Sequence, residues 1–116
     1  MSAQQVAVYG SLLSNKGNHC LLEGSKYIGT TLTPPEYTMY SLGGFPCIAL
    51  EGGTPIHVEV YEVDESVFGM LDRLEGYPSF YNRKEIETEL GTAWIYYISD
   101  VNYLGKLNVV TSGRWV

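Results

Sequence analysis

Short apolar runs, most of them closed by glycine or proline, follow one another along most of the chain. The clearest is residues 55–63, PIHVEVYEV, in which apolar and polar residues alternate. Because successive side chains of a strand point to opposite faces, this alternation predicts a strand with at least one buried face. Similar runs predict six or seven short strands, over residues 5–10, 25–33, 36–42, 46–53, 55–63, 83–90 and 92–98.

The strongest helical pattern is residues 65–75, ESVFGMLDRLE. Asp64 precedes it as a good N-cap, and Gly76 follows it as a left-handed exit. Residues 18–24, NHCLLEG, predict a second and shorter helical turn. The apolar stripe of the longer helix is predicted to contain Val67, Phe68, Met70, Leu71 and Leu74.

The tail from residue 100 onward has no clear pattern, and we expect it to wrap irregularly around the sheet with Trp115 as an anchor. Short strands together with two helices indicate an α+β fold built on a curled or closed sheet. A length of 116 residues without a linker predicts that residues 1–116 form a single domain.

Composition and charge narrow the classes of function. The net charge of −6 repels phosphate backbones and anionic membranes, which argues against nucleic-acid and membrane partners. The chain has no apolar run of transmembrane length and its first residues do not resemble a signal peptide, so we expect a cytoplasmic protein. Cys20 and Cys47 are far apart in sequence, and we expect reduced thiols.

Glu75 stands on or beside the apolar face of the helix, in line with Phe68 and Leu71. A carboxylate on such a face loses hydration, which raises its pKa. A carboxyl group of this kind can accept and return a proton near neutral pH. The alternative is a solvated glutamate in a fraying last turn of the helix.

Residues 8–13, VYGSLL, take the chain out of its first strand. Gly10 allows a close approach or a positive φ at this point. The amides of Ser11, Leu12 and Leu13 then leave the ladder and could converge on a carboxylate or an oxyanion. With one glycine and no lysine, the segment is not a phosphate loop. An ordinary strand-to-loop turn is the alternative.

Residues 77–83, YPSFYNR, follow Glu75 closely, and their aromatic side chains could either wall a small cavity or pack in the core. We expect Arg83 to pair with an internal acid rather than with a substrate carboxylate. His57 and Glu59 share one face of a strand, but no further ligands are evident, so we expect no metal site.

Several segments occur together in a specific order: VYGSL, VEVYEVDE, LDRLEGYP with YNR, and SGRW near the end. From Val6 to Trp115 the chain resembles the γ-glutamylcyclotransferase-like (AIG2-like) family, and most of all its short γ-glutamylamine cyclotransferase type. The resemblance implies a small mixed β-barrel with flanking helices. Val58 and Arg114 depart from the family pattern, which usually has glycine and an acidic residue there.

The resemblance also implies a reaction, in which a small-molecule γ-glutamyl substrate releases 5-oxoproline and a free amine. It makes Glu75 the catalytic acid/base and requires no metal or organic cofactor. The sequence itself is compatible with a monomer or with a homodimer. The residues that it assigns to substrate binding are Tyr9, Gly10, Ser11, Leu12 and Tyr81.

Two other functions are compatible with the same residues. One is a non-catalytic module that binds a small amino-acid-like ligand or a protein partner. The other keeps Glu75 as the acid/base but removes a γ-glutamyl protecting group from a biosynthetic intermediate.

Overall fold

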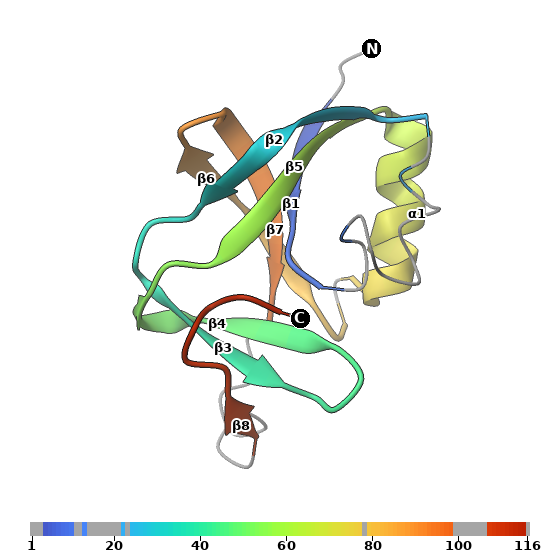
Figure 1. Ribbon diagram of the computed structural model, residues 1–116. Helices are drawn as coiled ribbons and strands as arrows, with labels where there is room; N and C mark the ends of the chain where they lie inside the picture. The colour runs from blue at the N-terminus through green and yellow to red at the C-terminus, as the bar shows by residue number, and fades with distance from the viewer. Residues whose placement is uncertain are drawn as a thin grey trace.

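Eight strands and one α-helix make up the described part of the computed structural model, which covers residues 4–10, 13, 22, 24–77, 79–98 and 107–115 (Figure 1). Each of the seven segments predicted as strands overlaps an observed strand. The elements are β1 Gln4–Val8, β2 Lys26–Leu32, β3 Tyr37–Ser41, β4 Pro46–Thr54, β5 His57–Val63, α1 Glu65–Glu75, β6 Asn82–Thr88, β7 Gly91–Tyr97 and β8 Asn108–Val109.

β1 is the central strand of a five-stranded sheet with the order β2-β5-β1-β7-β6. It runs antiparallel to β5, where Val6 is opposite Tyr61, and parallel to β7, where Val6 is opposite Trp94. Val6, Ala7 and Val8 are all buried, because both faces of the sheet are covered. Val6 and Val8 pack in the core cluster that includes α1, and Ala7 packs in the cluster that includes β3.

The expected barrel is wrong, because the two sheets do not close into one. β3 and β4 pair as a hairpin in a separate three-stranded sheet of order β4-β3-β8, and β2 and β6 remain the edges of the larger sheet (Figure 1). Pro34 and Pro35 separate β2 from β3 and contribute no N–H, which lets the chain leave the larger sheet. A main-chain bond from Ile98 N to Ile48 O (2.9 Å) links the end of β7 to β4.

The caps predicted for the long helix are confirmed. Asp64 accepts a hydrogen bond from the backbone N of Val67 (2.8 Å), and Gly76 ends α1 with a φ of 68°. α1 is the single helix among the described residues, whereas two were expected, and residues 18–24 lie almost entirely outside the described part. The eleven residues of α1 fall short of what a membrane-spanning helix needs.

The C-terminal tail is more regular than expected. Asn108–Val109 form β8, in which Val109 is opposite Tyr40 of β3. Further on, the backbone N of His57 donates to the carbonyl O of Gly113 (2.9 Å). Trp115 is partly buried against the core cluster that includes β3, which confirms its role as an anchor.

Candidate functional site

A cavity lies where the end of β1, the start of β4 and the last turn of α1 meet; Figure 1 shows the end of β1 beside that last turn. Its empty space is about 370 Å³, part of which is open to solvent. The described residues that line it are Ala7, Val8, Tyr9, Gly10, Phe45, Pro46, Glu75, Tyr81 and Tyr96. The structure therefore brings together four of the residues that the sequence singled out: Tyr9, Gly10, Glu75 and Tyr81.

Glu75 is the last residue of α1, and its side chain is half-buried at the cavity. It continues the face on which Phe68 and Leu71 are buried. Leu74, which was predicted on this stripe, is instead 40% exposed, so that part of the prediction is wrong. The helix presents a carboxyl group to the interior and turns a leucine outward. Burial raises the pKa of Glu75 to about 7.

Gly10 allows a close approach of the backbone rather than a positive φ, because its φ is not among the positive values of the described glycines. A Cβ atom at this position would lie 2.8 Å from Cδ and 2.9 Å from Cγ of Pro46. Pro46 also lines the cavity. The backbone N of Leu13 donates to the carbonyl O of Gly10 (3.0 Å), so its amide does not join an anion cradle as expected. Ser11 and Leu12 lie outside the described residues.

The crowding at Gly10 leads to a stability prediction. Gly10→Ala should lower the free energy of unfolding by about 1–3 kcal/mol, because a proline ring cannot move aside as a flexible side chain can. Urea unfolding measures this change. Gly44→Ala is the matched control, since a Cβ there meets nothing within 4 Å and should leave the unfolding midpoint nearly unchanged. Equal effects of the two substitutions would contradict the close packing at Gly10.

Tyr9 and Tyr81 are buried at the cavity, and each donates its hydroxyl proton to a main-chain carbonyl. Tyr9 Oη donates to the carbonyl O of Tyr96 (2.7 Å), and Tyr81 Oη donates to the carbonyl O of Pro46 (2.7 Å). Burial raises the pKa of Tyr9 well above its ordinary value, and the charges of Tyr81 and Glu75 raise it further. Tyr9 is therefore a neutral phenol at neutral pH, and both hydroxyls are held in fixed orientations by their hydrogen bonds.

Tyr96 lines the same cavity and was missed in the sequence. Its hydroxyl donates to Oδ1 of Asp72 (2.7 Å), which lies one turn before Glu75 on α1. Burial raises the pKa of Tyr96, and the hydrogen bond and charge of Asp72 raise it further. The signal that could have found this pair is the spacing of Asp72 and Glu75, which puts two carboxylates on adjacent positions of one helix surface.

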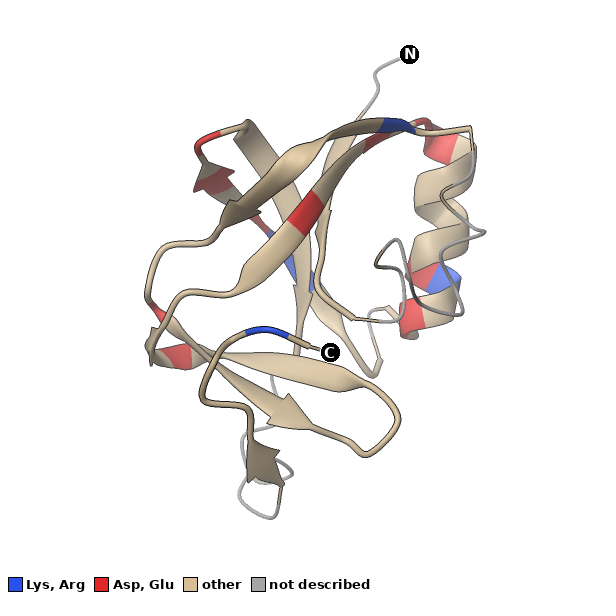
Figure 2. Cartoon of the chain, viewed as in Figure 1, with Lys and Arg blue, Asp and Glu red and all other residues tan. Residues whose placement is uncertain are grey.

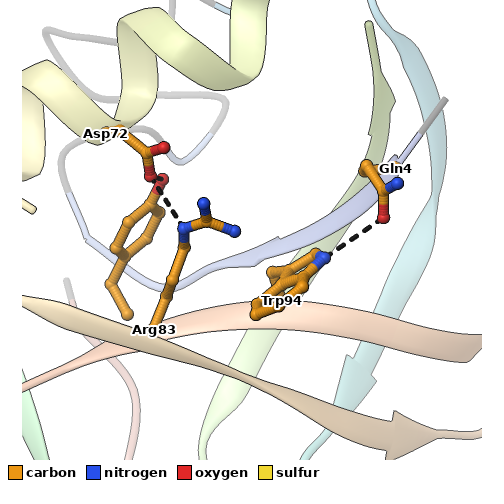
Figure 3. Close-up of polar contacts among 5 residues, drawn as sticks. Gln4, Asp72, Arg83 and Trp94 are labelled. Carbon is orange, nitrogen blue, oxygen red and sulfur yellow. Dashed lines mark hydrogen bonds and ion pairs between the residues drawn. The ribbon is translucent and has the colours of Figure 1, made fainter. Parts of the chain in front are cut away.

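Arg83 pairs with an internal acid, as expected. Its Nε lies 3.0 Å from Oδ1 of Asp72 (Figure 3), although the N–H is not aligned as a hydrogen bond. The guanidinium carbon lies 4.3–4.6 Å from the centres of the Phe68, Tyr77 and Trp94 rings. A cation over aromatic faces is attracted to them, and here three rings hold the arginine in one place.

The other residues that the sequence raised for chemistry are the pair His57 and Glu59 and the two cysteines. The described part of the chain contains no group of three or more His, Cys, Asp or Glu placed to hold a metal ion, and Glu59 accepts a hydrogen bond from Tyr61 Oη (2.8 Å). Cys47 is a free, fully buried thiol whose pKa is raised by burial to about 12, while Cys20 lies outside the described residues. Figure 2 shows the described Lys and Arg residues dispersed over the fold.

Comparisons with known proteins show the family and the fold of the chain. The family model described as "Gamma-glutamyl cyclotransferase, AIG2-like" matches residues 6–116. The chain belongs to this family. A Vibrio cholerae protein provisionally named as a γ-glutamylcyclotransferase is 44% identical over 110 residues, which cover 95% of this chain and 93% of that protein. AIG2-like structures confirm the mixed α+β fold.

Two solved structures of the AIG2-like family show how closely the backbone agrees. The solution structure of YtfP from Escherichia coli has a TM-score of 0.76 at 32% identity and covers 97% of this chain and 96% of that one. A crystal structure of an AIG2-like protein from Mus musculus has a TM-score of 0.87 at 19% identity. It covers 100% of this chain and 90% of that one, and at this identity it supports the fold alone.

Neither of the two departures from the AIG2-like pattern is among the described residues that line the cavity. Val58 is fully buried in the core cluster that includes β3, and it is not among the described residues that line the cavity. Arg114 is exposed, and its backbone N donates to Oγ of Ser112 (3.3 Å). Neither side chain narrows the described cavity.

Proposed function

We propose that the protein is a γ-glutamyl(amine) cyclotransferase. It takes a γ-glutamyl amide, closes the glutamyl part to 5-oxoproline and releases the amine. The observation that carries this proposal is a carboxyl group with a pKa near 7, half-buried at a cavity beside the exit of β1, in a member of this family. Reacting groups of one molecule need mainly to be held in a folded shape, which a small cavity favours.

In the proposed reaction the substrate's α-nitrogen attacks its own γ-carbonyl carbon. A new C–N bond forms, and the bond to the amine nitrogen breaks. Of the three protons on the α-ammonium group, one stays on the lactam nitrogen and two reach the departing amine. Glu75 takes these protons from one nitrogen and returns them to the other, which a carboxyl group with a pKa near neutrality does well.

The remaining cavity residues have supporting roles in the proposal. The chain around Gly10, continuing into Ser11 and Leu12, would hold the substrate's α-carboxylate or the developing oxyanion with main-chain amides. Tyr9 and Tyr81 would line the space around the glutamyl part. This chemistry moves protons and an acyl group only, so it calls for no metal or organic cofactor.

The direct test is incubation with a panel of γ-glutamyl amides, γ-glutamyl dipeptides and glutathione, followed by mass spectrometry for 5-oxoproline. We expect release from at least one γ-glutamyl amide. If every compound stays intact while some of them bind, the protein is a binding module on this fold, and the catalytic proposal is wrong.

The pH dependence of the reaction is a separate prediction. Glu75 must be ionised before it can take the first proton, so kcat/KM should fall below about pH 7, where its carboxyl group becomes protonated. Initial rates at low substrate concentration between pH 5 and pH 9 would show this acid limb. A flat profile down to pH 5 would contradict Glu75 as the base.

A further inference from the structure

The three described tyrosines that line the cavity all donate their hydroxyl protons to acceptors in the protein. Tyr9 and Tyr81 donate to carbonyl oxygens, and Tyr96 donates to the Asp72 carboxylate, each at 2.7 Å. Carbonyl and carboxylate oxygens can only accept, so the direction of each bond is set by chemistry. A phenol whose proton is already engaged in a hydrogen bond can only accept a hydrogen bond from a ligand. Phenols of this kind, such as Tyr9 and Tyr96, favour a donor group on the ligand.

Tyr96 is the best acceptor of the three. Its proton is held by a carboxylate, and a charged partner polarises the O–H bond and strengthens the oxygen as an acceptor. Arg83, which is enclosed by three aromatic rings, keeps that carboxylate in place through the 3.0 Å ion pair. Tyr9, Tyr81, Tyr96 and Glu75 all line the same cavity.

We propose that Tyr96 is a substrate-binding residue, which accepts a hydrogen bond from the substrate's α-ammonium group, and that Asp72 is the positioning residue that keeps the Tyr96 proton turned away. The proposal rests on the proposed function and adds two residues to it. A substrate carboxylate would meet phenolic lone pairs and Glu75 here, and both repel it. The carboxylate must therefore lie on the other side, toward Gly10 and the exit of β1. This order places the α-nitrogen beside the base that has to deprotonate it.

The test compares γ-glutamylethylamide with glutaryl ethylamide, which differs only in lacking the α-ammonium group. In Tyr96→Phe the KM for γ-glutamylethylamide should rise about tenfold, because a hydrogen bond to a charged group is lost. The Ki of glutaryl ethylamide should change less than about twofold. Tyr97→Phe is the matched control, since it removes a hydroxyl from the opposite face of β7 and should change neither constant. Equal changes for both ligands, or none, would overturn the role of Tyr96.

Asp72 is tested through Tyr96. Asp72→Ala frees the Tyr96 proton, so it should raise KM about as much as Tyr96→Phe, and adding Tyr96→Phe to it should raise KM no further. A lone buried arginine destabilises a fold, so Asp72→Ala with Arg83→Met is the second variant, in which both charges are removed. Additive effects of Asp72 and Tyr96 on KM would overturn the positioning role.

The proposal can fail separately from the proposed function. If the wild-type protein releases no 5-oxoproline, calorimetry with the same two ligands still decides the matter. γ-Glutamylethylamide should then bind more tightly than glutaryl ethylamide, and Tyr96→Phe should abolish most of the difference. Absence of binding by both ligands, or a difference that Tyr96→Phe leaves intact, would overturn the ammonium site.

Discussion

Glu75→Gln should slow the release of 5-oxoproline by a factor of about 10² to 10⁴, the usual contribution of a positioned acid or base. Glutamine keeps the shape of the side chain, so the cavity and its other lining residues stay in place. What is lost is the ability to move protons from the α-nitrogen to the departing amine. Measurement of kcat with γ-glutamylethylamide at pH 8 gives the effect, with KM expected to change much less than kcat.

Two comparisons make this result specific. Glu85→Gln removes an exposed carboxylate from β6 and should leave the rate unchanged. Circular dichroism of the Glu75→Gln protein should match the wild type, because the last turn of α1 is fixed by Gly76 and not by the charge of Glu75. Turnover by a folded Glu75→Gln protein at the wild-type rate would exclude the proposed acid/base role.

Local features were predictable from the sequence. The caps of α1, the strand at residues 57–63 and the position of Glu75 on the buried helix face all depend on spacings within one element. Apolar residues that recur every 3.6 residues indicate a helix face, and those that recur every 2 residues indicate a strand face, so these features can be read from the sequence. For the same reason the raised pKa of Glu75 could be anticipated, since it follows from burial of a carboxyl group among apolar neighbours.

Features that depend on contacts between distant segments were not predictable. The barrel prediction failed because nothing local shows that β3 and β4 form a hairpin apart from the larger sheet. Tyr96 was missed because its partner Asp72 lies 24 residues away, on another element. At Gly10 the neighbour that matters is Pro46, which a sequence pattern cannot place beside it. Leu13 was predicted to offer its amide to an anion. In the structure that amide donates to the carbonyl O of Gly10 within a turn, which the sequence pattern did not reveal.

The burial that raises the pKa of Glu75 also lowers the stability of the folded protein at pH values where the carboxyl group is ionised. Its pKa is about 7 in the folded protein against 4.5 for the ordinary group, so the folded state binds the proton more tightly than the unfolded state does. The stabilisation that comes from the protonated form is complete below about pH 4.5 and is lost as the pH rises through 7. At 1.36 kcal/mol for each pKa unit, the loss at pH 8 is about 3 kcal/mol.

Glu75→Gln should therefore be more stable than the wild type at pH 8, by up to about 3 kcal/mol, and the two should be nearly equal at pH 4.5. The neutral amide does not titrate, so it escapes the cost of burying a charge. Urea unfolding of both proteins from pH 4.5 to pH 8 measures the difference, with Glu85→Gln as the exposed control that should show no such trend. The same substitution would thus remove activity and add stability at pH 8, as expected where a carboxylate is kept in an unfavourable place for its chemistry. A constant difference across this pH range would mean that the carboxyl group of Glu75 is hydrated in the folded protein.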